Sequence, residues 1–234
     1  MKRLTIILSM GLFVSALLLS CNRENVNPVS ECRKAPDIYV KEITEGGASV
    51  EMVLESGANL WTAAPSYAVW AEYIDGTEES IYVTCKASKG YWEDYGSQED
   101  GLPVWYRIRS EAGYSENDPE LDAITTATPT RSSFTIHWEP VPGMREDTVQ
   151  LYVEANLPYD YNSFYTQAKG ENGQPSLIWM SRFYFDGDQL NQVQPFRIVG
   201  RGHPQGLDSK IYFDLNGITT EGQIFNRITL GEVE

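Results

Sequence analysis

The chain has 234 residues, 33 of them acidic and 18 basic, and its formal net charge is −15 at pH 7. This balance argues against a nucleic-acid partner, because phosphates are neutralised by Lys and Arg clusters that the sequence lacks. Two histidines leave little room for an imidazole-rich metal centre, and we expect no metal site. With 41% hydrophobic residues the chain has enough apolar side chains to build a core, which excludes intrinsic disorder.

The first 20 residues have the composition of an export signal. Lys2 and Arg3 precede an uncharged, mostly apolar run from Leu4 to Leu19, and a small residue, Ser20, follows. The sequence Leu-Leu-Ser-Cys that ends at Cys21 resembles the lipobox of bacterial lipoproteins. That resemblance implies that Cys21 is acylated, becomes the first residue of the mature protein and anchors it to a membrane. A single membrane span is the alternative, but the apolar run is slightly shorter than the ~20 residues that a crossing needs.

The residues after the signal divide into a tether and one domain. Residues 21–35 are mostly polar and lack periodicity, so we interpret them as a tether, and residues 36–234 contain no long linker. No run of acids follows the lipobox, which favours the periplasmic face of an outer membrane. Cys32 and Cys85 are the two further cysteines. They could pair in an oxidising envelope, or Cys85 could be a small core side chain in phase with Ile81 and Val83.

Beyond residue 36 the hydrophobic pattern has a period of two. Val50, Met52 and Leu54 alternate with polar residues, as expected when one face of a strand is buried. The pattern predicts an all-β fold, an antiparallel β-sandwich, immunoglobulin-like or related, because one-sided strands need a second apolar face to pack on. We expect about eleven strands, near residues 37–43, 49–55, 66–74, 80–87, 104–110, 133–139, 148–156, 176–185, 194–200, 210–215 and 223–230. Gly46-Gly47 and Asp75-Gly76 are predicted hairpin turns.

Aromatic residues gather in two gaps between the predicted strands. Rings beside carboxylates and amides can stack on sugars, which makes these residues candidates for ligand binding. The alternative is that the rings fold back and cap the open ends of the sandwich. His203, in a Gly-His-Pro loop, is a further candidate for ligand binding, with an ordinary hydrogen-bonded histidine as the alternative. The aromatic candidates are Tyr91, Trp92, Tyr95, Tyr159 and Tyr161.

Four short motifs occur in the order found in an uncharacterised family of bacterial predicted periplasmic proteins. They are Asp122-Ala-Ile-Thr-Thr-Ala-Thr128, Trp138-Glu139, Val153-Glu-Ala-Asn156 and Gly173-Gln-Pro-Ser176. The resemblance covers roughly residues 66–230. It implies a secreted β-sandwich and assigns no reaction.

The first of these motifs is also similar to the D-x-x-[ST]-G-A-[ST] signal at which a transferase couples FMN to envelope electron-transfer proteins. The similarity implies flavin attachment at Thr128, whose hydroxyl would form the phosphoester. The sequence departs from the signal at Thr126, which stands where the signal has glycine, and a β-branched residue resists a positive φ. The alternative is a Thr-rich turn. We therefore expect no cofactor, with FMN as the competing hypothesis.

No enzymatic motif emerges from the sequence. A G-x-S-x-G elbow and a G-x-G-x-x-G phosphate loop are both absent. We interpret the chain as a lipid-anchored envelope protein with a non-catalytic binding or accessory domain, linked to periplasmic redox systems if the flavin signal is meaningful. Its partner would be an envelope protein or a glycan. A carbohydrate-binding lipoprotein and a flavinylated electron carrier are the two alternatives.

Overall fold

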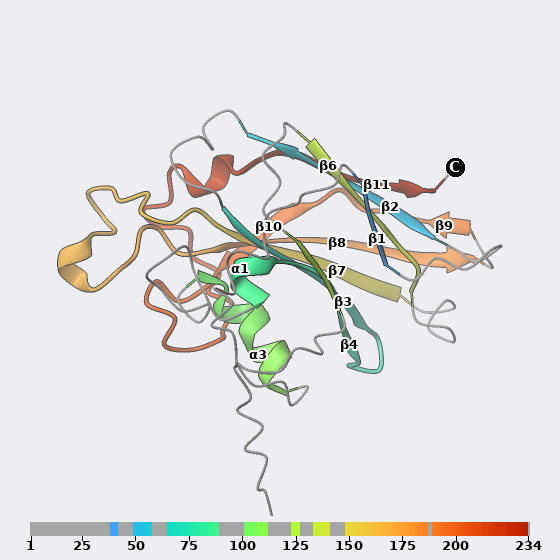
Figure 1. Cartoon of the computed structure of the whole chain (residues 1–234), viewed down its shortest axis with the longest axis horizontal. Coiled ribbons are helices and arrows are strands. Elements are labelled where there is room, and N and C mark those ends of the chain that lie inside the picture. The colour runs from blue at the N-terminus through green and yellow to red at the C-terminus, as the bar shows by residue number, and fades with distance from the viewer. Residues whose placement is uncertain are drawn as a thin grey trace, which may run out of the picture.

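Two β-sheets face each other in the computed structural model (Figure 1), which confirms the predicted all-β sandwich. The structure describes residues 38–41, 49–57, 65–88, 101–111, 123–126, 133–140, 148–186 and 189–233. Several predictions lie outside these residues: the export signal, the tether, Cys21, Cys32, the turn at Gly46-Gly47, Tyr91, Trp92, Tyr95 and Thr128.

The smaller sheet has four strands in the order β1-β6-β2-β11. Strand β2 pairs antiparallel with both β6 and β11, whereas β1 runs parallel to β6. The strand bounds are β1 Ile38–Lys41, β2 Val50–Ser56, β6 Ser133–Trp138 and β11 Phe225–Glu232.

The larger sheet has seven strands, six of them in the order β10-β8-β7-β3-β4-β5, with β9 paired to β8. Strand β5 runs parallel to β4, because the chain between them passes through the helices α1 (Cys85–Ser88) and α3 (Pro103–Glu111). A parallel pair needs such a crossover. The bounds are β3 Ser66–Tyr73, β4 Glu78–Thr84, β5 Ile124–Thr126, β7 Thr148–Asn156, β8 Leu177–Asp186, β9 Gln189–Asn191 and β10 Arg197–Arg201.

The main core lies between the two sheets. The alternating residues Val50, Met52 and Leu54 of β2 are at most 2% exposed, as their period-two pattern predicts. They pack in one cluster with residues of the larger sheet such as Val69 and Leu151. Burial of these side chains stabilises the fold by roughly 25 cal/mol for each Å² of apolar surface removed from water.

A second core covers the outer face of the larger sheet. There α3 lays Val104, Trp105 and Ile108 on a cluster that includes Trp70 and Ile178. The prediction of a strand at 104–110 is therefore wrong. The spacing i, i+1, i+4 of the buried residues is helical, and the alternation of Val104, Tyr106 and Ile108 imitated a strand.

Strand β4 also departs from its predicted pattern. Its pairing with β3 shifts between Val69 and Trp70, as at a β-bulge. As a result Ile81 and Tyr82 both lie in the core between the sheets, and Val83 lies in the outer cluster, so the predicted common face of Ile81, Val83 and Cys85 is wrong. Cys85 begins helix α1, is 5% exposed and takes part in a disulfide whose other half lies outside the described residues.

The turns and short elements agree only in part with the sequence-based prediction. The predicted turn at Asp75-Gly76 is confirmed, with a φ of 84° at Gly76 and the Asp75 carboxylate accepting the Thr77 amide. The predicted strand 210–215 is reduced to one bridge between Tyr212 and Arg201. Strands β5 and β9 and the 3₁₀-helices Gln167–Lys169 and Glu221–Gln223 were not predicted.

Candidate functional site

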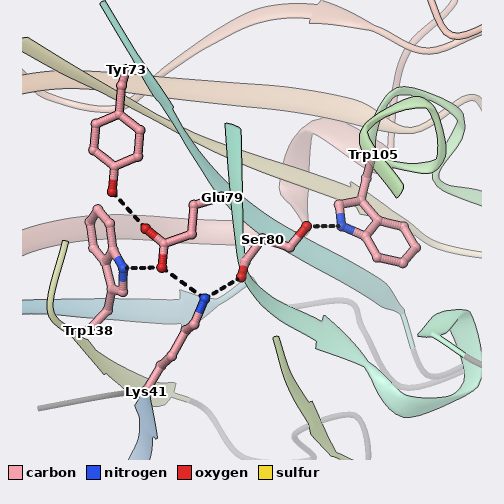
Figure 2. Close-up of polar contacts among 6 residues, drawn as sticks. All are labelled: Lys41, Tyr73, Glu79, Ser80, Trp105 and Trp138. Atoms are coloured by element: carbon pink, nitrogen blue, oxygen red, sulfur yellow. Dashed lines mark hydrogen bonds and ion pairs between the residues drawn. The ribbon is translucent and has the colours of Figure 1, made fainter. Parts of the chain in front are cut away.

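Three polar regions of the described chain can be compared as candidate sites. The first lies between the sheets at Glu79, on β4, whose carboxylate points toward Lys41, Tyr73 and Trp138 beside the core (Figure 2). Glu79 accepts hydrogen bonds from Lys41 Nζ at 2.8 Å, Tyr73 OH at 2.6 Å and Trp138 Nε1 at 3.1 Å. Lys41 is 5% exposed and Glu79 is 9% exposed, so the ion pair is buried.

This network has the properties of a structural link. Lys41 comes from the edge strand β1 of the smaller sheet and also donates to the Ser80 carbonyl at 2.9 Å, so it joins the two sheets (Figure 2). The acceptors of Glu79 are engaged by three donors, which leaves the carboxylate poorly placed to act on a substrate. We therefore assign the network to stability and not to chemistry.

The second region is the junction of β7, β8 and the start of α3. Glu154 of β7 is 0% exposed and accepts the amides of Val104 at 3.3 Å and Trp105 at 2.7 Å. The Ser176 hydroxyl donates to the same carboxylate at 2.6 Å. Glu154 thus caps the helix N-terminus, where amides lack intrahelical acceptors and an anion is favoured.

Burial raises the pKa of Glu154 from 4.5 to about 7, and the hydrogen bonds from Ser176, Trp105 and Val104 oppose that rise. A carboxyl group that titrates near neutrality is often functional, but here it faces a helix and not a cavity. The segments Val153–Asn156 and Gly173–Ser176 meet at this point, since the Ser176 hydroxyl donates to Glu154.

The third region is the set of loops at one end of the sandwich, on the left of Figure 1. Here the loop after β7 is tied to the loop before β11. Asn162 Nδ2 donates to the Gly217 carbonyl at 2.8 Å, and the Tyr165 hydroxyl donates to the Asn216 carbonyl at 2.8 Å. The ring of Phe164 packs on Gly217, where an added Cβ would lie 2.4 Å from the ring. These contacts fix the loops relative to each other.

A half-buried carboxylate reinforces the same loops. Asp160 accepts the Gln174 amide at 2.8 Å and the Thr220 hydroxyl at 2.6 Å, and Gln174 Oε1 accepts the Thr219 amide at 2.6 Å. Burial raises the pKa of Asp160, and the hydrogen bonds from Thr220 and Gln174 oppose the rise. Gln174, from the last of the four motifs, therefore holds the loops together.

These fixed loops carry large apolar side chains that point into solvent. We call them the loop-end surface, and their exposed fractions run from 38% for Tyr161 to 84% for Phe213. The surface consists of Tyr159, Tyr161, Phe164, Leu207, Phe213 and Leu215. Tyr159 and Tyr161, which were predicted for ligand binding, are thus exposed and belong to it. Neither ring folds back as a cap, whereas the neighbouring Tyr165 is 2% exposed.

His203, the other described candidate, has a local role. Its Nδ1 accepts the backbone amides of Gln205 at 3.1 Å and Leu207 at 3.3 Å, and its ring contacts Tyr212 edge-on at 5.8 Å between centroids. These contacts shape the loop that presents Leu207. The structure therefore does not place His203 at a catalytic cluster within the described residues.

Sequence reasoning did not find Phe213 and Leu215, because the predicted strand at 210–215 placed both on its apolar face, and this expectation is wrong since Phe213 is 84% exposed. It also did not single out Leu207. The signal that could have located them is the polar, Gly- and Pro-containing surroundings of residues 200–208. No cluster of metal-binding side chains occurs among the described residues, and no helix there is long and apolar enough to cross a bilayer.

The described part of the chain is thus an all-β sandwich. A helix covers its larger sheet, and loops at one end carry exposed apolar side chains. Comparison with protein-family models, with curated proteins and with solved structures found no match to this chain.

Proposed function

We propose that the chain is a lipid-anchored protein of the bacterial cell envelope whose sandwich domain is a non-catalytic binding module. Its contact surface is the loop-end surface. The observation that carries the proposal is the exposure of Phe213 (84%) and Leu207 (74%) on loops that are fixed by internal hydrogen bonds. Soluble domains rarely expose large apolar side chains together unless they contact something.

The fixed loops make binding efficient. A side chain that is already held in its bound position loses little conformational entropy when a partner arrives, so more of the burial energy contributes to affinity. Aromatic rings such as Phe164 and Phe213 are also the side chains that dominate contact energies at interfaces. An envelope protein is therefore the partner that we propose for this surface.

The test is in-cell crosslinking of the full chain in its bacterial host. The variants Phe213→Ser and Phe164→Ser should lose the crosslinked partner, whereas Ile74→Ser should keep it. Ile74 is the matched control, because it is 69% exposed but lies in the turn between β3 and β4. Equal crosslinking by all four proteins would overturn the proposal.

A glycan is the second candidate partner, and the exposure of Tyr159 and Tyr161 favours it. Retention of the full chain on isolated cell-wall glycan, lost in Tyr161→Ala and kept in Ile74→Ser, would assign the surface to carbohydrate. Attachment through Cys21 is tested separately. The chain should partition with membranes, and Cys21→Ser should release it to the soluble fraction.

A further inference from the structure

Strand β11 forms an open edge of the smaller sheet. It pairs with β2 on one side, and no other described strand pairs with it on the opposite side. The other described sheet edges are shorter or covered. Strand β1 has four residues and β5 three, and β10 is bridged at Arg201 by Tyr212 through backbone bonds of 2.9 and 2.8 Å. An edge strand of eight residues offers backbone groups to another chain.

The second half of this edge lacks the usual protection against such pairing. Natural edge strands are guarded by prolines, charged side chains or bulges. In β11 the irregular pairing lies between Phe225 and Arg227, and Arg227 is bound to Glu55 with an Nε–Oε1 distance of 3.0 Å. Apart from Glu232 at its end, the segment Ile228–Glu232 has no charged residue and no Pro, and its pairing to β2 is regular. It is therefore competent to add a strand.

Two adjoining hollows flank this segment. The first, of about 490 Å³, lies between residues 193–196 and residues 226–230, and Pro195, Phe196 and Ile228 give it apolar walls. The second, of about 670 Å³, lies at the end of the strand. Val193 and Leu230 line both hollows, so the two adjoin along β11.

Two carboxylates line the second hollow, which wraps around the end of the strand. Glu51 lies opposite Gly231 on the outer face of the smaller sheet, beside His137, whose Nε2 lies 3.0 Å from Glu51 Oε2, whereas Glu232 lies opposite Val50 on the inner face. Glu232 also accepts the Leu190 amide through Oε1 at 2.7 Å. Two carboxylates beside an apolar wall suit an ammonium or guanidinium group on an aliphatic stem, which a Lys or Arg side chain supplies. The chain as a whole carries a net charge of −15, which favours a basic partner.

We propose that β11 is a docking strand for an extended, basic segment of a partner polypeptide. The segment pairs with the backbone of Ile228–Glu232 and lays apolar side chains in the hollow beside Phe196. Its Lys or Arg side chain lies between Glu51 and Glu232. Strand addition of this kind obtains affinity from main-chain hydrogen bonds and specificity from side-chain pockets. The surface is separate from the loop-end surface, so the inference goes beyond the proposed function.

The probe for this site is a synthetic peptide, acetyl-Thr-Val-Thr-Val-Thr-Lys-amide, titrated calorimetrically into the full chain in detergent micelles. The decisive variant is Gly231→Val. An added Cβ at Gly231 meets no atom within 4 Å, and a β-branched residue suits a strand, so the fold should keep its stability while the new side chain fills the acidic hollow. We expect peptide affinity to fall about tenfold or more, with an unchanged or higher Tm.

Two controls define the contacts. Ile38→Thr, on the opposite edge of the same sheet, should bind the peptide like the unsubstituted chain. Glu232→Gln should weaken binding, and added salt should reduce the difference between the two proteins. A peptide with alternate backbone amides methylated should not bind.

Three outcomes would overturn the proposal. Equal binding of the methylated peptide would exclude backbone pairing, and equal binding of a peptide with Glu in place of Lys would exclude the charge contact. Concentration-dependent dimers of the chain that Gly231→Val abolishes would show that a second copy occupies the edge. The variant Phe213→Ser should bind the peptide normally, so failure of the proposed function and failure of this inference are distinguishable.

Discussion

The two buried glutamates of the larger sheet, Glu79 and Glu154, show two ways of keeping a carboxylate out of water. Glu79 faces the interior between the sheets and is paired with the Lys41 ammonium at 2.8 Å. Glu154 faces the covering helix and accepts hydrogen bonds from two amides and one hydroxyl, all of them neutral donors. One carboxylate is balanced by a full charge, and the other is balanced by dipoles alone.

Whether the partner of the buried carboxylate is charged or neutral determines how the stability of each region depends on pH and on mutation. Neutral donors do not fully replace the lost hydration of Glu154, and burial therefore raises its pKa to about 7. The Ser176 hydroxyl can donate to the carboxylate or accept from the carboxylic acid, so the region accommodates either protonation state. At Glu79 the stabilising partner is itself charged, and removal of that partner leaves an uncompensated buried charge.

The largest expected effect comes from Lys41→Met, which removes the ammonium and keeps the length of the side chain. We expect the free energy of unfolding at pH 7 to fall by about 3–5 kcal/mol, because the Glu79 carboxylate stays buried without its cation. Urea denaturation measures the loss. The double variant Lys41→Met with Glu79→Gln should recover a large part of it, and a single variant as stable as the unsubstituted protein would contradict the ion-pair assignment.

The next effect is the pH dependence that Glu154 contributes. Its folded pKa is raised from 4.5 to about 7, so the folded state binds the proton more tightly than the unfolded chain. The stabilisation is complete below pH 4.5 and is lost as the pH rises through 7, a change of ~3 kcal/mol. The measurement compares the unfolding free energies of the unsubstituted protein and Glu154→Gln from pH 4 to pH 8. The unsubstituted protein should lose stability relative to Glu154→Gln as the pH rises, and a difference that stays constant with pH would exclude the raised pKa.

A smaller effect is expected from Ser176→Ala, which removes one donor to Glu154. The hydrogen bond to an ionised group contributes about 1.5–3 kcal/mol when the carboxylate is charged, and less at pH 7, where it is partly protonated. Because this hydrogen bond lowers the pKa of Glu154, its loss should move the titration further upward. Denaturation at pH 5 and pH 8 measures both effects. Equal losses at the two pH values would show that the hydroxyl does not contact the carboxylate.

The smallest effect on the pH profile belongs to Trp105→Phe, which keeps an aromatic ring but removes the indole donor to Ser80 Oγ at 3.1 Å. The lost hydrogen bond accounts for about 1 kcal/mol of the expected destabilisation. The cavity left by the fully buried indole adds to it, and the pH dependence of Glu154 should be unchanged. The backbone amide that caps Glu154 remains in the variant. A changed pH profile would mean that the ring, and not the amide, sets the environment of the carboxyl group.

The sequence predicted the inner half of the sandwich well. The period-two alternation in β2, β6 and β7 located these strands and their buried faces. It succeeded because their inward side chains pack only in the apolar core between the two sheets. The prediction for the outer face of the larger sheet was wrong, because no helix was expected to cover it. Simple alternation along β7 would put Glu154 on a solvent face with Gln150 and Tyr152, whereas helix α3 covers it. The segment that forms α3 has the alternating pattern of a strand. Its helical N-terminus is capped by Glu154, which lies 49 positions from Trp105 in the sequence, so no local pattern reveals the cap.

The long-range polar contacts could not be predicted from the sequence either. Lys41 alternates in phase with Tyr39, but nothing local indicates that an ammonium will find a carboxylate across the sandwich. Tyr159 and Tyr161, the described aromatic candidates for ligand binding, are exposed, and ligand binding by them stays a prediction. Burial of Tyr165 in the same loop depends on its bond to Asn216, which only the folded chain brings near.

Trp105 has a consequence for the motions of the molecule. Its backbone amide is held by Glu154 on one side, and its indole is held by Ser80, whose carbonyl accepts the Lys41 ammonium. The helix is therefore fastened to the central strand β7 and, through two successive contacts, to the interior of the sandwich. In deuterium-exchange labelling the amides of α3 should open together with those of β4 and β7 as one cooperative unit, and not as a separately fraying segment.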